Sequence, residues 1–158
     1  MSVDPLRRRI ALSPLALGLA WSAAPAGHAA ALPAAQSLAS ELAQALRAGK
    51  PLLVMASLDG CPFCRLVRDN HLAPLLREGE VAGVQLDMQS AQAVTGFDGA
   101  RRTHQEILSA WSVKVAPTVL FFGKGAREAA PRLEGASIPD FYGAYLDERL
   151  RTARRALG

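Results

Sequence analysis

Cysteine and histidine are scarce in this chain. Of its 158 residues, two are cysteines, Cys61 and Cys64, and three are histidines. Structural zinc sites use four Cys or His ligands, and half of such a set is missing here. A metal site would have to recruit His71, seven positions beyond Cys64, which could approach only if Pro74 distorts the intervening helix. We therefore expect no metal and no organic cofactor, with metal binding by the cysteine pair as an open alternative.

Aromatic residues are also few, at 6% of the chain, and they are not interleaved with basic residues. Such interleaving would be expected of a nucleic-acid-binding surface, so we predict no nucleic-acid partner. The basic residues are dispersed except for a cluster at Arg149, Arg151, Arg154 and Arg155. This cluster is typical of the C-terminal end of a helix, where the helix dipole stabilises cations.

The chain has no long uninterrupted apolar run, and its nearest approach to one lies near the N-terminus. Three arginines at 7–9 precede an apolar stretch over 10–21, and small residues follow at 23–31. This order is that of a secretory signal, and the stretch falls short of the about 20 residues of a membrane span. We assign residues 1–30 as a signal peptide, cleaved after residue 29, 30 or 31. An uncleaved signal anchor is the alternative.

Export would place the cysteine pair in an oxidising compartment, the periplasm. Cysteine pairs in such compartments usually form structural disulfides. A bridge between Cys61 and Cys64 closes a very small loop, however, and removes little conformational entropy from the unfolded chain. Close spacing with little gain in stability favours a redox-active pair, while a purely structural disulfide stays open as an alternative.

Hydrophobic periodicity divides the remaining chain, residues 31–158, into alternating helices and strands that form one domain. This order indicates an α/β fold, with a central mixed sheet of four or five strands and helices on both faces. The number of strands is open because no strand is evident before Ser37. We predict helices over 37–48, over 63–77 with a kink at Pro74, over 103–111, and from Ser137 onward with Phe141, Tyr145 and Leu146 facing the core. We predict strands over 52–57, 81–88, 115–122 and 129–134, and a loop over 89–102.

The CPFC motif lies between a strand and the start of a helix. Unpaired amide groups and the helix dipole create a positive potential there, which favours thiolate over thiol. Cys64 lies one turn further into the helix and should be less exposed than Cys61. We therefore assign Cys61 as the attacking thiol and Cys64 as the resolving thiol. Arg65 follows the motif, which excludes the CxxCH pattern of haem attachment.

The chain resembles the thioredoxin fold family in two segments. The CPFC motif follows LLVMASLDG, and VAPTVLFF begins 51 positions after Cys64. The resemblance covers roughly residues 37–150 and is greatest to exported bacterial thioredoxin-like proteins, including those associated with sulfur oxidation. It implies a thioredoxin-like fold. It also implies that the segment Ala116, Pro117 and Thr118 carries a cis-proline beside the cysteine pair and holds an incoming peptide in extended form.

Two positions depart from the pattern of that family. Gly60 stands where many thioredoxins have a tryptophan, and Met55 stands where many have a buried aspartate. A buried carboxylate can assist proton transfer, so its replacement leaves the proton acceptor of Cys64 unassigned. Asp59 is close in sequence, but we interpret it as a turn residue.

The sequence therefore predicts an exported, monomeric thiol–disulfide oxidoreductase whose partners are protein thiols or disulfides. A membrane-embedded electron donor would be needed if the protein acts as a reductant. The two residues between the cysteines do not decide between reductant and oxidant. The alternative from another functional class is a noncatalytic binding module with a permanently oxidised cysteine pair.

Overall fold

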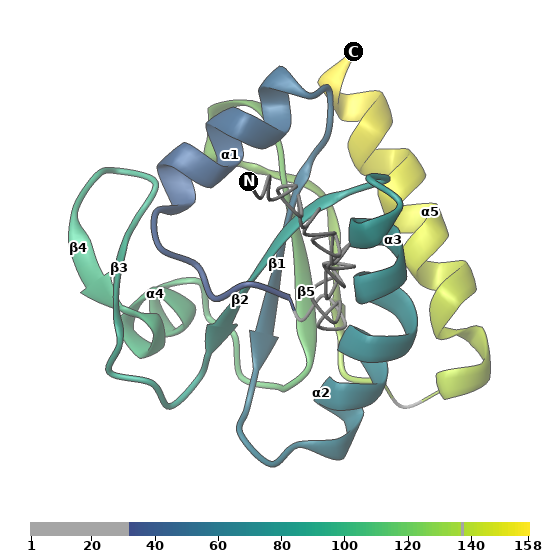
Figure 1. The fold of residues 1–158 in the computed structure, drawn as a ribbon, viewed down its shortest axis with the longest axis horizontal. Helices are drawn as coiled ribbons and strands as arrows, with labels where there is room; N and C mark the ends of the chain where they lie inside the picture. The colour runs from purple at the N-terminus through teal and green to yellow at the C-terminus, as the bar shows by residue number, and fades with distance from the viewer. Residues whose placement is uncertain (1–31, 137) are drawn as a thin grey trace, which may run out of the picture.

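The computed structural model describes residues 32–136 and 138–158 (Figure 1). The assigned signal peptide, residues 1–30, and the expected helix cap Ser137 lie outside the described residues. Within the described part of the chain, no helix is both long enough and apolar enough to cross a membrane.

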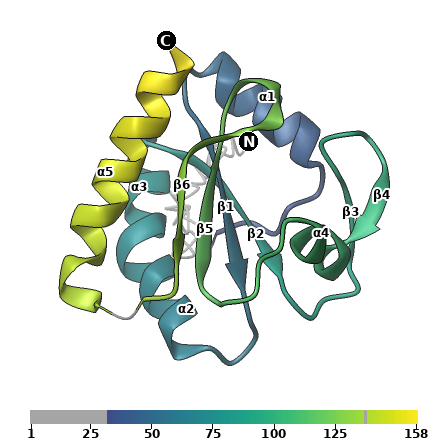
Figure 2. The same cartoon turned by 180° about the vertical axis from the view of Figure 1, so that it is seen from behind.

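A four-stranded mixed sheet forms the centre of the described domain (Figures 1 and 2). Its spatial order is β2-β1-β5-β6, where β1 pairs parallel with β2 and antiparallel with β5, and β5 pairs antiparallel with β6. The predicted fold class is therefore confirmed. The strands are β1 (Leu52–Ser57), β2 (Ala82–Asp87), β5 (Thr118–Phe122) and β6 (Glu128–Glu134).

A short extended segment occupies the edge beside β2, where a fifth strand would lie. The Gln85 N–H donates to the Pro33 carbonyl at 2.8 Å, and the Ala35 N–H donates to the Gln85 carbonyl at 2.9 Å. The pairing ends there because Ser37 already caps the first helix, with its hydroxyl accepting from the Ser40 N–H at 3.4 Å. The question of four or five strands thus resolves, among the described residues, to a central sheet of four strands with an isolated bridge between Ala34 and Gln85 at its β2 edge.

Helices cover both faces of the sheet and create two separate cores. β1 is buried throughout because its side chains alternate between the cores. Leu53 and Met55 pack with α2 and α5, whereas Val54 and Ala56 pack with α1 and α4. The helices are α1 (Leu38–Arg47), α2 (Pro62–Val67), α3 (Ala73–Arg77), α4 (His104–Ala110) and α5 (Pro139–Leu157).

The helix expected over 63–77 is interrupted as predicted, but the irregular turn precedes Pro74. A five-residue π-helix, Arg68–Leu72, separates α2 from α3. Proline has no N–H to donate to the preceding turn and its ring crowds that turn. The chain accommodates Pro74 by placing it in the first turn of α3, directly after the wider π turn.

Two elements differ from the prediction. The segment 89–102 is not simply a loop, because it contains most of a small hairpin formed by β3 (Ala93–Thr95) and β4 (Arg101–Thr103). Strands of three residues are too short to show a periodicity. Arg102 and Asp98 close this hairpin with two hydrogen bonds, at 2.9 and 2.6 Å.

The inward face of α5 was also predicted wrongly in part. Leu146 is buried as expected, but Phe141 is 60% exposed and Tyr145 is 46% exposed. The buried stripe instead runs through Tyr142, Leu146 and Leu150, which recur every four residues. Phe141 and Tyr145 each precede a stripe residue by one position, which turns them by about 100° from the core.

His104, the first residue of α4, is 2% exposed and links α4 to β2. Its Nδ1 accepts a hydrogen bond from the Asp87 N–H at 3.2 Å. Burial lowers the pKa of His104, because a buried imidazole resists protonation, although the Ala35 backbone and the charges of Asp87 and Glu41 partly oppose this shift. The folded protein therefore binds this proton less readily than the unfolded chain does.

We expect the free energy of unfolding to have its full value above about pH 6.5, the ordinary pKa of histidine. It should decrease as the pH falls below that value, because protonation of His104 then favours the unfolded chain. Substitution His104→Asn, whose side-chain oxygen can still accept from Asp87, should weaken this decline. Urea unfolding at pH 7.5 and pH 5.5 measures both. His71, whose pKa burial also lowers, would account for the dependence that remains. An equal decline in wild type and variant would contradict the role of His104.

Candidate redox site

A tight turn carries the chain from the end of β1 to the first cysteine. Gly60 has a φ of +70°, in the left-handed region that glycine adopts without steric cost. The Asp59 carboxylate accepts from the Gly60 N–H at 2.9 Å, as befits a turn residue. The Cys61 N–H donates to the Leu58 carbonyl at 3.2 Å and closes the turn.

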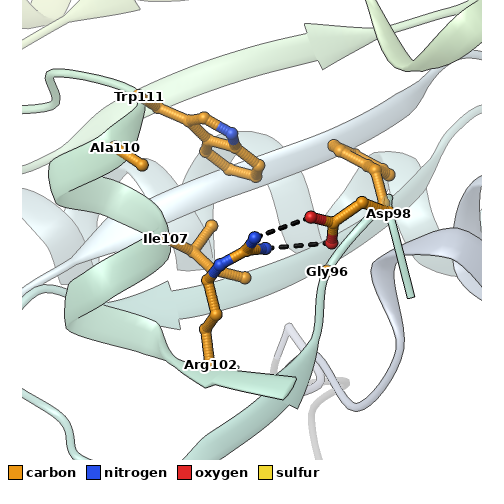
Figure 3. A pocket seen from close by; sticks show the side chains of 7 residues that line it. Gly96, Asp98, Arg102, Ile107, Ala110 and Trp111 are labelled. Carbon is orange, nitrogen blue, oxygen red and sulfur yellow. Dashed lines mark hydrogen bonds and ion pairs between the residues drawn. The ribbon is translucent and has the colours of Figure 1, made fainter. Parts of the chain in front are cut away.

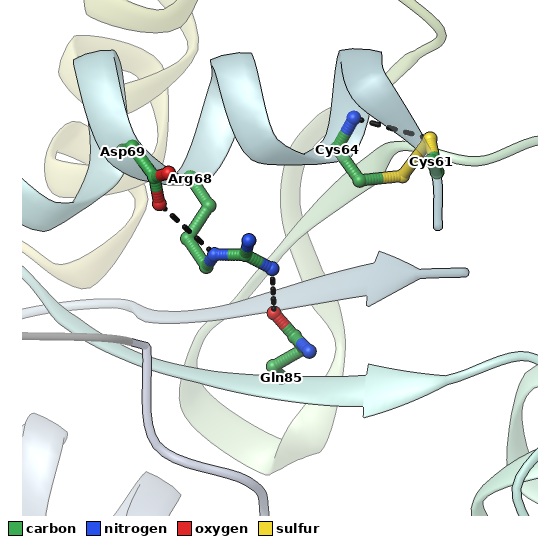
Figure 4. A network of polar contacts seen from close by, with 5 residues as sticks. All are labelled: Cys61, Cys64, Arg68, Asp69 and Gln85. Carbon is green, nitrogen blue, oxygen red and sulfur yellow. Dashed lines mark hydrogen bonds and ion pairs between the residues drawn. A yellow bond between two sulfur atoms is a disulfide. The ribbon is translucent and has the colours of Figure 1, made fainter. Parts of the chain in front are cut away.

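Cys61 and Cys64 form a disulfide at the start of α2, with their Cα atoms 5.3 Å apart (Figure 4). Cys61 is the N-cap residue and Pro62 occupies the first turn, where its missing N–H has no cost. The Cys64 N–H donates to the Cys61 Sγ at 3.1 Å. Cys64 is 1% exposed, whereas Cys61 is only partly buried. The more accessible cysteine is thus the one at the helix N-terminus.

The pairing of β1 with β5 brings a distant segment to the same end of the sheet. Ala56, near the end of β1, is the antiparallel partner of Thr118, the first residue of β5. The segment that precedes Thr118 therefore lies at the edge where the cysteine turn begins. The peptide bond between Ala116 and Pro117 is cis, and the Thr118 hydroxyl donates to the Val115 carbonyl at 2.7 Å.

A hollow of about 200 Å³, which we call the proline hollow, joins this segment to the cysteine motif. Phe63 of the motif lines it together with Ala116 and Pro117, so these predicted residues meet the CPFC segment. Thr118 does not line it, because its side chain is buried and bonds to Val115. The lining residues are Phe63, Val115, Ala116, Pro117, Gly135 and Ala136.

A second hollow beside Cys61, of about 190 Å³, is strongly polar. Arg68 crosses from the π turn toward β2, where its Nη1 donates to the Gln85 Oε1 at 3.3 Å, and its Nε donates to Asp69 at 3.0 Å (Figure 4). Sequence reasoning missed this hollow because its walls come from separate elements without a shared motif. They are Ser57, Leu58, Asp59, Gly60, Cys61, Arg65, Arg68, Gln85 and Asp87.

The buried side of Cys64 is apolar. Met55 is fully buried and belongs with Cys64 to the core beneath α2 and α5. The strand therefore offers no carboxylate to Cys64 at this position. The carboxylates of Asp59 and Asp87 lie instead around the polar hollow beside Cys61.

His71 faces α5 from the π turn. Its ring centroid lies 5.1 Å from that of Tyr142, and burial lowers the pKa of His71 while Asp147 partly opposes the shift. Among the residues described, no group of three or more His, Cys, Asp or Glu side chains is placed to hold a metal ion.

A third hollow, of about 220 Å³, lies beside the β3–β4 hairpin and α4 (Figure 3). Asp98 and Arg102 pair across it beneath Trp111, and this hydrogen-bonded pair lowers the pKa of Asp98 to about 2. Ile107 on its wall belongs to the core on the α1 and α4 face, whereas Cys64 belongs to the other core. This hollow therefore lies on the opposite face of the sheet from the disulfide and is not part of the redox site.

Comparisons with known proteins agree with this architecture. The sequence model of a family described as thioredoxin-like domain matches residues 38–149. Similar solved structures include the DsbH oxidoreductase (18% identity, 80% of this chain and 88% of that chain, TM-score 0.51) and a poplar thioredoxin h (17% identity, 72% and 95%, TM-score 0.50). The periplasmic thioredoxin SoxS from Paracoccus pantotrophus matches at 21% identity over 66% of this chain and 99% of its own, with a TM-score of 0.44.

A comparison with curated protein sequences finds no match. These three structures are below 25% identity, and the DsbH and poplar structures, with TM-scores of 0.51 and 0.50, speak for the fold alone. The family match covers most of the chain and includes both cysteines and the cis-proline segment. The chain therefore belongs to the thioredoxin-like domain family.

Proposed function

We propose that the protein is an exported thiol–disulfide oxidoreductase that exchanges disulfides with protein clients through Cys61 and Cys64. The observation that carries the proposal is the asymmetry of the pair. Cys61, partly exposed, lies at a helix N-terminus two residues before Phe63 of the proline hollow, and Cys64 is buried one turn further into the helix. A disulfide retained only for stability would have no need of this arrangement.

The exchange conserves atoms and electrons in two steps. In the reducing direction, the Cys61 thiolate attacks one sulfur of a client disulfide, and the other client sulfur leaves as a thiolate that takes up a proton. The Cys64 thiol then loses its proton and attacks the Cys61 sulfur, which releases the second client sulfur. The client gains two electrons and two protons, and the protein is left with the Cys61–Cys64 disulfide.

The helix N-terminus supports the first step. It favours the thiolate form of Cys61, since the Cys64 N–H already points at the Cys61 Sγ. Cys64 loses its proton in the second step, and the apolar core around it holds no acceptor on β1. We assign acceptance of that proton to water in the polar hollow beside Cys61, whose walls include Asp59 and Asp87.

The proline hollow is proposed as the place where the client chain lies next to its disulfide. Ala116 and Pro117 line it, and Thr118 fixes the turn before β5 through Val115. The partners are then protein thiols or disulfides, and the protein acts as a monomer. Where electrons flow toward the client, a membrane-embedded donor is the proposed source that reduces the Cys61–Cys64 disulfide again.

Substitution of each cysteine by serine should separate the two roles. Cys61→Ser should lower the rate of insulin reduction by dithiothreitol to the uncatalysed rate, because the attacking thiolate is lost. Cys64→Ser should retain the first attack and accumulate mixed disulfides with the client, visible as adducts by non-reducing electrophoresis. Catalysis that survives Cys61→Ser, or adducts that form equally in a Cys61→Ser variant, would contradict these roles.

The periplasmic location is proposed from the sequence of residues 1–30. Expression of the full chain in a bacterium with a periplasm should yield a protein in the periplasmic fraction that begins at residue 30, 31 or 32. Intact-mass measurement gives the N-terminus. Substitution of the arginines at 7–9 by glutamate is the matched control and should retain the precursor in the cytoplasm. A full-length periplasmic or cytoplasmic product from the wild-type chain would contradict the assignment.

A further inference from the structure

The polar hollow beside Cys61 is lined by charged side chains of both signs. Arg65 and Arg68 supply cations, and Asp59 and Asp87 supply carboxylates. In the described part of the chain, these four side chains form no ion pair with one another. Opposite charges that share a hollow without pairing leave both signs available to a ligand that carries both.

The end of the sheet and the first turns of α2 bring these charges together. Ser57 and Asp87, the last residues of β1 and β2, are partners in the parallel register, so both strands end at the hollow. Asp59 follows in the turn before the motif. The Arg65 N–H donates to the Cys61 carbonyl at 3.2 Å, which places Arg65 one helical turn beyond the cysteine. The charges therefore come from separate elements but line the same hollow as Cys61.

The charged groups keep polar atoms that the fold itself does not use. The Asp59 Oδ1 accepts from the Gly60 N–H, and the Asp87 Oδ1 accepts from the Gln89 N–H, both at 2.9 Å. Among the described residues, the Oδ2 of each aspartate has no hydrogen-bond partner, and neither has the exposed Arg65 guanidinium. Two carboxylate oxygens and one guanidinium are thus free to contact a ligand.

The size and the charges of the hollow fit the amino-acid half of a small disulfide. Its volume of about 190 Å³ lies below the about 300 Å³ at which pockets for drug-sized ligands begin. In cystine, the disulfide of free cysteine, each sulfur is one methylene away from a carbon that bears both an ammonium and a carboxylate. A cysteine within a polypeptide has amide bonds in place of these charges, and so has the cysteine of glutathione.

We propose that the polar hollow beside Cys61 binds the amino-acid group of cystine, which makes small zwitterionic disulfides a second substrate class besides protein disulfides. Arg65 and Arg68 bind the carboxylate. Asp59 and Asp87 accept hydrogen bonds from the ammonium. The ligand takes the place of water in the hollow while it reacts. The inference rests on the proposed function, since it uses the same cysteine pair and the same supply of electrons.

The reaction consumes the reduced protein and yields two molecules of cysteine. The Cys61 thiolate attacks one sulfur of cystine, and the first cysteine leaves as a thiolate that takes up a proton. The Cys64 thiol then loses its proton and attacks the Cys61 sulfur, and the second cysteine leaves the hollow as a thiolate that takes up a proton. Relative to its dithiol form, the protein gives up two electrons and two protons and is left with the Cys61–Cys64 disulfide.

Small disulfides of different charge test the proposal with the reduced wild-type protein. They are zwitterionic cystine, dicationic cystamine, dianionic dithiodipropionate and neutral bis(2-hydroxyethyl) disulfide. Each second-order rate constant is divided by that of the same disulfide with dithiothreitol, which removes differences in intrinsic reactivity. We expect the normalised rate constant of cystine to exceed each of the others about fivefold, the effect of two exposed charge contacts.

The two enantiomers of cystine provide a comparison at identical charge and intrinsic reactivity. The bond to Cys61, the carboxylate contact and the ammonium contact fix three groups around one carbon, and only one hand can make all three at once. L-cystine and D-cystine should therefore differ in rate about twofold, the loss of one exposed contact.

Variants assign the preference to the hollow through the ratio of the cystine rate to the bis(2-hydroxyethyl) disulfide rate, which cancels effects on the cysteine pair itself. Arg65→Gln and Asp87→Asn should each lower this ratio about twofold, and the double variant should bring it near unity. The asparagine side chain can still accept from Gln89, so the local fold is retained. Arg77→Gln is the matched control, because it removes an exposed arginine outside the hollow, and it should keep the ratio.

Each failure identifies the claim that is wrong. Equal normalised rates for the differently charged disulfides, a preference for the dication or the dianion, or equal rates for the enantiomers would overturn the inference. So would a preference that survives the double substitution or disappears in Arg77→Gln. The proposed function stands in all these cases if insulin is still reduced. A wild-type protein that reduces neither insulin nor any small disulfide would overturn the proposed function, and this inference with it.

Discussion

The antiparallel pairing of β1 with β5 is the constraint on which the rest of the site depends. It places Ala56 opposite Thr118, so the end of one strand meets the beginning of the other. The turn that carries Cys61 and the segment that carries Pro117 are more than fifty residues apart in the chain, yet they leave the sheet at the same edge. Without this register, the CPFC motif would be an ordinary helix start with no surface beside it.

Burial then makes the two sulfurs unequal. The core beneath α2 and α5 encloses Cys64 together with Met55, while Cys61 stays partly exposed and lines the polar hollow, and Phe63 of the same motif lines the proline hollow. The apolar side, around Pro117, is suited to holding a polypeptide. The polar side, with Arg68 and Gln85, offers hydrogen-bonding groups that suit bound water and proton transfer. In the proposed function, the two sides provide separate surroundings for the client and for proton transfer.

The strongest features of the fold were predictable from the sequence. β1 and β5 are buried throughout and apolar except for Ser57 and Thr118 because both faces of each are covered, and proline and glycine mark the turns around them. Cys61 and Cys64 could be assigned from spacing and from their place before a helix, and the resemblance to thioredoxins pointed to Pro117. The hairpin of β3 and β4 was missed because three-residue strands carry no usable period.

The side-chain surroundings of the site were less predictable, because they depend on tertiary geometry. Arg68 and Gln85 meet across the polar hollow from a π turn and a strand, and no local pattern relates them. Phe141 and Tyr145 were expected in the core because both are aromatic residues near the start of an amphipathic helix. The rotation of α5 about Tyr142 and Leu146 exposes them instead.

The central claim is that the Cys61–Cys64 couple exchanges with other thiols rather than serving as a fixed crosslink. Equilibration of the purified protein in buffers of graded reduced and oxidised glutathione, followed by acid quenching and thiol counting, tests this most directly. The account predicts reversible titration from disulfide to dithiol, with a reduction potential above about −300 mV, the range below which structural disulfides lie. A pair that stays fully oxidised at every glutathione ratio, or that is reduced only with unfolding of the domain, would contradict it.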